Sequence, residues 1–162
     1  MLGLVENKVA LVTGGSSGMG RATSILFAKE GAKVVIADIA VPGGHETVRM
    51  VKEAGGEATF IKTDVRVASE VKSLVDETVR IYGRLDCAYD CAGVLGWIEP
   101  GKTDTDTEEN WDIIIDTNLK GVWLCMKYEI AQMLKQGKGT IVNQASAIAL
   151  IGAGDGNYPY CA

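Results

Sequence analysis

The chain has 162 residues, of which 47% are apolar and 23% are charged, and its formal net charge is −5. This apolar content argues against a disordered chain, and the acidic balance argues against a nucleic-acid-binding surface, which needs a basic stripe. No apolar run is long enough to span a bilayer, and residues 1–8 lack the basic-then-apolar order of a signal peptide. The cytoplasm is therefore the expected location.

Apolar runs that predict strands alternate along the chain with helical patterns. Glycines at Gly31, Gly55 and Gly83 end the first three helical patterns. The predicted strands are residues 8–12, 33–37, 58–61, 85–89 and 140–143, and the predicted helices are residues 18–30, 43–54 and 67–82.

A fourth helix is expected after a polar stretch that ends with helix-start chemistry at Thr107. Trp111, Ile114 and Val122 fall on one face of this helix, which continues to residue 134 with a bend at Gly121. The remaining segment, 146–162, is rich in Gly, Ala and Tyr and is expected to form a loop.

The alternation of strands and helices with short connections predicts an α/β fold with a parallel sheet covered on both faces. Right-handed crossovers give a doubly wound, Rossmann-type sheet, most simply in the strand order 3-2-1-4-5. The sequence shows no repeat, linker or low-complexity segment, so residues 1–162 are expected to form one domain.

A glycine-rich turn, residues 13–20, directly follows the first predicted strand and opens the first helix. Glycine lets the backbone approach a pyrophosphate closely, and the N–H groups of the following helix point at the phosphates. The turn therefore predicts a phosphate cradle. The alternative is an ordinary tight connection between a strand and a helix.

Asp38 closes the second strand, 18 residues after Gly20. A carboxylate at this place accepts hydrogen bonds from the ribose hydroxyls of a dinucleotide and repels a 2′-phosphate. Its sequence neighbours, Ala37 and Ile39, are not basic. Asp38 therefore favours NAD over NADP, although it could also be a solvated residue at a strand end.

Two more strand ends carry candidate ligand contacts. Asp64 and Val65 follow the third strand, where the carboxylate could accept from the adenine amino group or could cap the next helix. Small residues after the fourth strand, in the sequence Asp90-Cys91-Ala92-Gly93, would let the chain pass close to a ligand, or could form a plain turn.

The four cysteines do not have the spacing of a zinc site, so reduced thiols and no metal are expected. They are Cys87, Cys91, Cys125 and Cys161.

Several motifs, in this order and at nearly this spacing, resemble the short-chain dehydrogenase/reductase family over the whole chain. They are Thr13-Gly14, Gly18-Met19-Gly20, Asp38, Asp64-Val65, Ala92-Gly93, Asn118 with Gly121, Asn143 with Ser146, and Tyr160-Cys161-Ala162.

The resemblance implies site residues for an oxidoreductase with a nicotinamide cofactor. Tyr160 matches the general acid or base, Ser146 the serine that hydrogen-bonds the substrate carbonyl, and Asn118 the asparagine of the proton relay. Tyr158 does not match, because it would place Ala162 at the position of the family's lysine. The implied cofactor contacts are Gly14, Ser16, Ser17, Gly18, Met19, Gly20, Asp38, Ile39, Asp64, Val65, Cys91, Ala92 and Gly93.

The chain departs from the family in two ways. It stops at Ala162, before the lysine that would help to form the tyrosine phenolate and before the long helix, two strands and substrate-covering loop that follow in the family. We interpret it as the amino-terminal part of a longer enzyme, and a self-sufficient short form is the alternative. It also has Asp90-Cys91 where the family has Asn-Asn, which adds a negative charge and removes the amide donors.

The favoured hypothesis is an NAD-dependent enzyme that transfers hydride between nicotinamide and a secondary alcohol or ketone. A dinucleotide-binding module without turnover is the alternative, and a receiver-type regulatory domain does not explain the glycine turn. The resemblance also implies a homo-oligomer with an interface on the helices of residues 111–134. Trp97 and Ile98 are expected to border the pocket of a small-molecule substrate whose identity the sequence does not specify.

Overall fold

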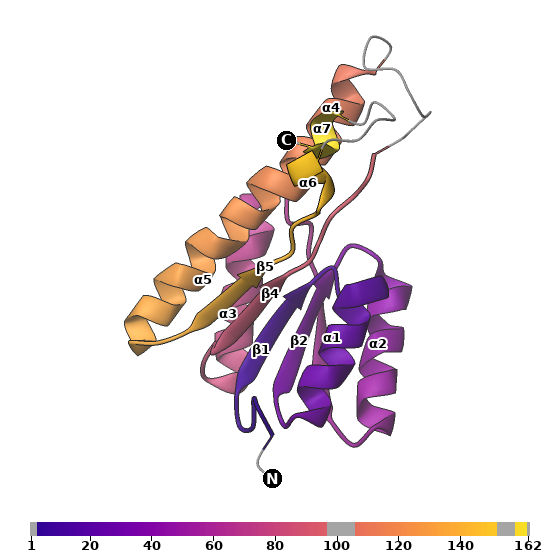
Figure 1. The fold of residues 1–162 in the computed structure, drawn as a ribbon. Helices are drawn as coiled ribbons and strands as arrows, with labels where there is room; N and C mark the ends of the chain where they lie inside the picture. Colours follow the sequence, from indigo (N-terminus) through magenta and orange to yellow (C-terminus); the bar gives the residue numbers. More distant parts are fainter. Residues whose placement is uncertain (1–2, 97–105, 152–157, 162) are drawn as a thin grey trace.

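The computed structural model describes residues 3–96, 106–151 and 158–161. Strands and helices alternate from the amino terminus to the last strand (Figure 1). The strands are β1 (Val9–Thr13), β2 (Lys33–Asp38), β3 (Glu57–Lys62), β4 (Cys87–Asp90) and β5 (Thr140–Asn143), and the helices are α1 (Gly18–Lys29), α2 (Val41–Glu53), α3 (Ala68–Tyr82), α4 (Glu108–Ile115), the π-helix η2 (Asp116–Gly121), α5 (Val122–Gln136), α6 (Ile148–Ile151) and α7 (Tyr158–Cys161).

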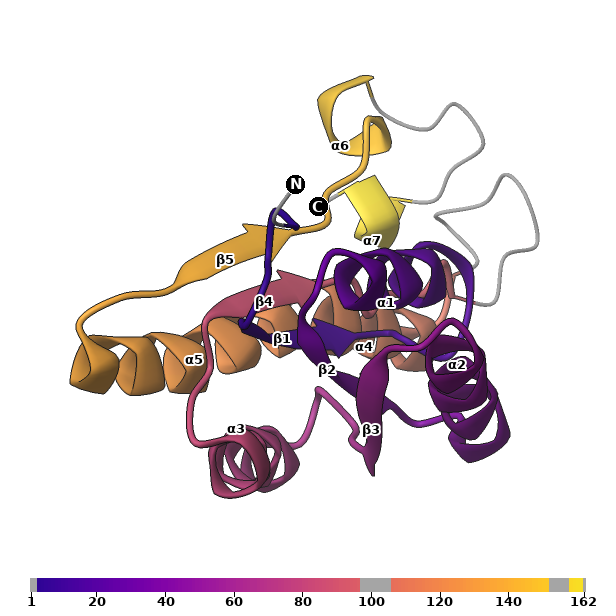
Figure 2. The same ribbon diagram turned by 90° about the horizontal axis from the view of Figure 1, so that it is seen from below.

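The strands pair in parallel in the order β3-β2-β1-β4-β5, which confirms the predicted doubly wound sheet. Helices α1 and α2 cover one face, while α3 and α5 cover the other (Figure 2). Strand β5 lies at one edge of the sheet, so among the described residues the sheet ends there.

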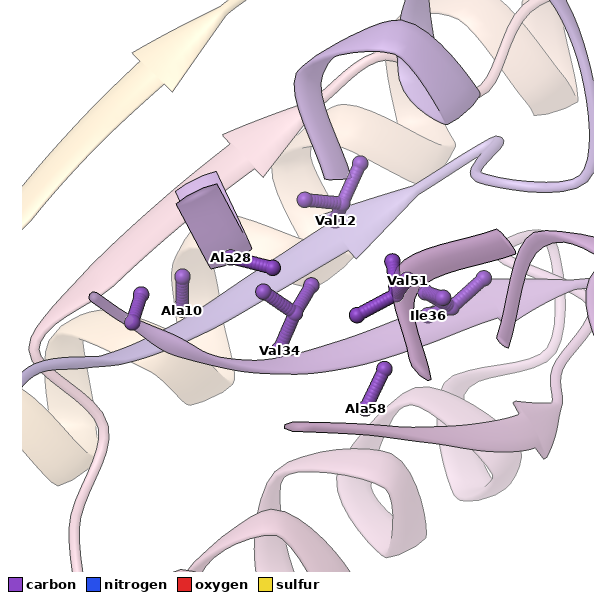
Figure 3. Packing of buried hydrophobic residues seen from close by; sticks show 8 residues of the cluster. Ala10, Val12, Ala28, Val34, Ile36, Val51 and Ala58 are labelled. Atoms are coloured by element: carbon purple, nitrogen blue, oxygen red, sulfur yellow. The ribbon is translucent and has the colours of Figure 1, made fainter. Parts of the chain in front are cut away.

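Successive residues of the central strands point to opposite faces and build two cores, as expected for a strand with layers on both sides. Ala10 and Val12 face α1 and α2, where they pack with residues such as Ala28 and Val51 (Figure 3). Leu11 lies between them in sequence and packs on the other face with Leu74 of α3. The carboxyl ends of these rigid strands therefore form a fixed edge.

The long helical region contains a feature that is wider than an α-helix. Helix α4 begins after Thr107, whose side chain accepts a hydrogen bond from the Asn110 N–H at 3.1 Å. The π-helical segment η2 follows and ends at Gly121, the residue at which the sequence predicts a bend. A Cβ on Gly121 would lie 2.8 Å from the Val65 side chain, so glycine permits close packing of this segment.

Two expectations about helices are wrong in detail. Helix α2 begins at Val41 rather than at residue 43, because Pro42 fits in its first turn. The backbone N–H groups of the first turn have no partner within the helix, so the missing N–H of proline costs nothing there. The final segment is not entirely loop, since it contains α6 and α7. The Ser146 carbonyl accepts from the Ala149 N–H, which closes a local turn at the start of α6.

None of the helices in the described ranges has the length and hydropathy that crossing a membrane requires.

Candidate functional site

A cavity of about 650 Å³ lies at the carboxyl edge of the sheet, next to the ends of β1, β2, β3 and β4. Every residue that the sequence analysis assigned to cofactor contacts lines it, from the glycine turn to Gly93. The lining residues without such an assignment are Ala37, Ala40, Thr63, Arg66, Val94, Ile113 and Thr117.

The glycine turn packs so closely that side chains have no room at two positions. A Cβ on Gly20 would lie 2.2 Å from the Gly14 carbonyl oxygen, and a Cβ on Gly14 would lie 2.8 Å from the backbone of Ala92. Gly14 also has a φ of +68°, which favours glycine. The turn thus brings the start of α1 against the chain that leaves β4.

The amino end of α1 opens into this cavity without a capping side chain. Ser17 is the N-cap residue, yet its side chain makes no capping hydrogen bond, and the first turn contains no acidic residue. The first turn of the helix, Gly18 to Gly20, lines the cavity. Unpaired N–H groups at a helix start favour an anion such as a phosphate.

Asp38 lines the cavity at the end of β2. Its carboxylate accepts hydrogen bonds from the N–H groups of Ser16 at 3.0 Å and Ala40 at 2.9 Å. These contacts fix the carboxylate beside the glycine turn. Two basic residues that sequence neighbours did not reveal are close by, because Lys62 pairs in register with Asp38 and Arg66 lines the cavity.

Asp64 is engaged by Arg66 in a two-pronged ion pair. The Arg66 Nε lies 2.9 Å from Oδ1 of Asp64, and the Arg66 Nη2 lies 2.6 Å from Oδ2. Hydrogen bonding from Arg66 holds the pKa of Asp64 below its ordinary value. The alternative that Asp64 caps α3 is wrong, because Val67 is the N-cap residue and no side chain caps this helix.

The chain that leaves β4 forms one wall of the cavity and is tied to β1 by a hydroxyl group. Thr13 Oγ1 accepts from the backbone N–H groups of Cys91 at 3.1 Å and Ala92 at 3.3 Å. Because Cys91 and Ala92 line the cavity, this hydroxyl sets the position of the wall.

Asn118 joins the π-helical segment to the same wall. Its Nδ2 donates to the Val94 carbonyl at 2.8 Å, and its Oδ1 accepts from the Val94 N–H at 2.9 Å. This pair of bonds is the bridging role that a half-buried asparagine can have apart from any part in catalysis.

The other two predicted catalytic residues, Ser146 and Tyr160, are not in the lining of the cavity. Ser146 follows β5, and its hydroxyl oxygen accepts from the Ile148 N–H at 3.3 Å. Tyr160 is on α7, which contacts α6 and α4 (Figure 1). Trp97 and Ile98, expected at the substrate pocket, fall outside the described residues.

Asp90 is only 2% exposed, although the sequence analysis expected it to add a negative charge in place of the family's asparagine. Burial raises its pKa, which opposes the charged form. Cys125 and Glu129 lie beside it, and one oxygen or sulfur atom from each of the three falls within 4.8 Å of the others. This buried Glu129 was not identified from the sequence.

None of the four cysteines forms a disulfide in the described part of the chain.

Comparison with known proteins relates this arrangement to a family. The family model described as short chain dehydrogenase matches residues 8–162. An uncharacterized oxidoreductase of Thermotoga maritima is 43% identical over 147 residues, which are 91% of this chain and 57% of that protein. The cyclohexanol dehydrogenase of an Acinetobacter species is 38% identical over 91% of this chain and 58% of its own length. The chain therefore spans somewhat more than half the length of these relatives.

Solved structures give the same result for the fold. An NAD⁺-bound xylitol dehydrogenase superposes with a TM-score of 0.92 at 28% identity, over 98% of this chain and 60% of that one. An actinorhodin polyketide ketoreductase variant with NADPH gives a TM-score of 0.89 at 35% identity, over 95% and 58%. With its Rossmann-type sheet and glycine turn, this chain belongs to the short-chain dehydrogenase family.

Proposed function

We propose that the protein to which this chain belongs is an NAD-dependent oxidoreductase that transfers hydride between nicotinamide and a secondary alcohol or ketone. One observation carries the proposal: the glycine turn and the Asp38 carboxylate line the same cavity at the carboxyl edge of the sheet. This is the edge at which doubly wound sheets bind their ligands.

The phosphate end of the proposed nucleotide lies at the glycine turn. Side chains are excluded at Gly14 and Gly20 by neighbouring backbone, and the start of α1 is neither capped by a side chain nor screened by an acid. A pyrophosphate there would receive N–H groups and the positive end of the helix dipole.

The ribose end of the nucleotide lies at Asp38. A carboxylate fixed by the Ser16 and Ala40 N–H groups accepts from ribose hydroxyls and repels a 2′-phosphate, which favours NAD. The positive charges of Lys62 and Arg66 would instead favour a 2′-phosphate, but Arg66 is already paired with Asp64. The relatives with NAD⁺ and with NADPH show that this fold accepts both nucleotides, so both belong in the test.

The catalytic roles that we propose follow the resemblance. The bound nicotinamide would supply or accept the hydride. The Tyr160 hydroxyl would give a proton to the substrate oxygen or remove it, and the Ser146 hydroxyl would hold that oxygen by a hydrogen bond. Asn118, fixed to Val94, would complete the path for the proton.

Calorimetry on the full-length protein tests the nucleotide proposal. We expect NADH to bind more tightly than NADPH. Asp38→Ala should weaken NADH binding by about 1–2 kcal/mol and should narrow the difference in affinity between NADH and NADPH. Asp112→Asn, which changes an exposed acid on α4, serves as the control and should leave both affinities unchanged. Equal affinities of wild type and Asp38→Ala for both nucleotides would refute the ribose assignment.

Turnover with a panel of secondary alcohols separates the enzyme from a binding module. Wild type should reduce NAD⁺ with at least one alcohol, while Tyr160→Phe should retain nucleotide binding and lose turnover. Nucleotide binding without turnover on any alcohol or ketone would support the non-catalytic module instead.

We further propose that the protein forms a homo-oligomer through the outer face of α4 and α5. Five large apolar residues on these helices and η2 are each at least 45% exposed, whereas Met133 on the opposite side is buried in the core. The exposed residues are Trp111, Leu119, Trp123, Ile130 and Leu134. Sedimentation of the full-length protein measures the state directly. The cytoplasm remains the expected compartment on the sequence features alone.

A further inference from the structure

Three side chains that could each carry a negative charge meet in the interior between β4 and α5. Asp90 ends β4, while Cys125 and Glu129 lie one turn apart on α5. Their exposed fractions are 2%, 1% and 0%, and one polar atom from each lies within 4.8 Å of the other two. The cluster is thus closed to solvent.

No cation neutralises this cluster among the described residues. Asp90 interacts with Cys125, Glu129 and the uncharged Thr13 of β1, and Glu129 interacts with Asp90 and Cys125. Apolar residues, including Val71 of α3, also pack in the cluster that contains Cys125. Two unpaired carboxylates in such surroundings would cost several kcal/mol each.

Hydrogen bonding restricts where a proton can be. Thr13 Oγ1 accepts from the Cys91 and Ala92 N–H groups, so its own hydrogen is directed to Asp90 Oδ1, 3.5 Å away. Asp90 Oδ1 is therefore an acceptor. The Oδ2 of Asp90 and both oxygens of Glu129 are buried and receive no hydrogen bond.

We propose that Asp90 and Glu129 share one proton, held between Asp90 Oδ2 and the Glu129 carboxylate, and that this proton fixes the end of β4 in the position that forms the cavity wall. A carboxylate contact that lacks a hydrogen is repulsive, while the same contact with one proton is a strong, charge-assisted hydrogen bond. The protonated acid supplies the hydrogen that an asparagine amide would supply at position 90.

The protonation equilibria of the three groups agree with this assignment. Burial raises the pKa of Asp90 and of Glu129, and the proximity of the two acids raises that of Glu129 further. Burial also raises the pKa of the Cys125 thiol, which keeps its hydrogen and so is a poor metal ligand. A shared proton therefore fits the site better than a bound cation.

The effect on the cavity depends on a short chain of contacts and rests on the proposed function. Asp90 accepts from Thr13, and Thr13 holds Cys91 and Ala92, which line the cavity. When the proton leaves, two negative charges remain behind this wall. Nucleotide binding should then weaken as the pH rises.

Infrared spectroscopy on the full-length protein tests the shared proton itself. The carbonyl stretch of a buried, protonated carboxyl group should be present near neutral pH in the wild type. It should be lost in Asp90→Asn and in Glu129→Gln, since each leaves one carboxylate that accepts from an amide. Asp112→Asn, an exposed acid, should leave the band unchanged.

The pH dependence of unfolding provides the second measurement. A carboxyl group whose pKa is raised by folding stabilises the fold at acid pH and loses that contribution as the pH rises through the folded value. The melting temperature of the wild type should therefore fall with rising pH by several degrees relative to Asp90→Asn. The Kd for NADH should rise over the same range in the wild type only.

The outcomes separate this inference from the proposed function. A missing band and identical pH profiles of wild type and Asp90→Asn would overturn the shared proton. So would a Zn²⁺-dependent rise in melting temperature that Cys125→Ala abolishes, because a cation would then hold the cluster. If the band is present and NADH binding ignores pH, the link to the wall fails. If no variant binds either nucleotide, the proposed function fails while the infrared result stands.

Discussion

Two buried aspartates stand at opposite ends of β4 and behave in opposite ways. Asp86, just before the strand, is 5% exposed and is met by Arg84 and by the Val9 N–H at 3.0 Å. Burial raises its pKa, but these partners outweigh burial and leave the pKa below its ordinary value. Asp90 is buried to a similar degree but has no cation beside it in the described part of the chain, and burial raises its pKa.

The comparison shows that a guanidinium and an N–H donor can outweigh burial, which otherwise raises the pKa of a buried acid. At the amino edge of the sheet, the carboxylate is charged and ties β1 to the start of β4. At the carboxyl edge, the acid lies behind a wall that faces a cavity. The amino edge should therefore contribute mainly to stability and the carboxyl edge mainly to binding.

The largest expected effect comes from Gly20→Ala at the carboxyl edge. The added methyl group would lie 2.2 Å from the Gly14 carbonyl oxygen, so the turn must open and its N–H groups must move. We expect the affinity for NADH to fall by about 100-fold or more, which is ~2.7 kcal/mol or more. Calorimetry measures the loss, and Gly55→Ala, remote from the cavity and with a φ of +82°, is the control for a strained glycine replacement that leaves the turn intact. Normal binding by Gly20→Ala would show that the turn does not hold the phosphates.

A smaller effect, on stability, is expected for Asp86→Ala. The change leaves the buried Val9 N–H without its acceptor and removes the partner of Arg84. The free energy of unfolding should fall by about 2–3 kcal/mol, as measured by urea denaturation, with little change in NADH affinity for the folded fraction. If Asp86→Ala lost much of its affinity for NADH but kept the stability of the wild type, the amino edge would not contribute mainly to stability.

The smallest effect is a difference in pH dependence. Because folding lowers the pKa of Asp86, its contribution is present above the ordinary aspartate value of about 3.9 and is lost as the pH falls through the folded value. The stability gap between wild type and Asp86→Asn should therefore narrow on acidification. The gap between wild type and Asp90→Asn should change on the alkaline side instead. Melting curves at a series of pH values measure both, and parallel curves for the two variants would contradict the comparison.

Much of the fold could be predicted because each strand and helix is marked by a pattern of apolar residues within its own short segment. Strand β5 was predicted with the bounds it has, and the strand order followed from the alternation of elements. The glycine turn and Asp38 could also be placed in one cavity, because the carboxyl ends of parallel strands share an edge.

The features that the sequence analysis missed depend on contacts between distant segments. Lys62 reaches Asp38 only through the register of β2 and β3, and no local pattern specifies a register. Glu129 had a weak signal, since it lies four residues from both Cys125 and Met133 and so shares their buried face. An acid on that face indicates an interior partner, but the partner becomes known only from the fold.

The π-helical turn of η2 determines which side chains of the following helix, α5, face the core. Each α-helical residue advances the side-chain direction by about 100°, so one residue accommodated in a wider turn shifts the whole of α5 by that angle relative to α4. This phasing turns Glu129 inward and Trp123 outward on the same helix. Shortening the turn by one residue would rotate the buried face of α5 by about 100° away from the core, so a single local irregularity aligns both the acid pair and the exposed apolar face.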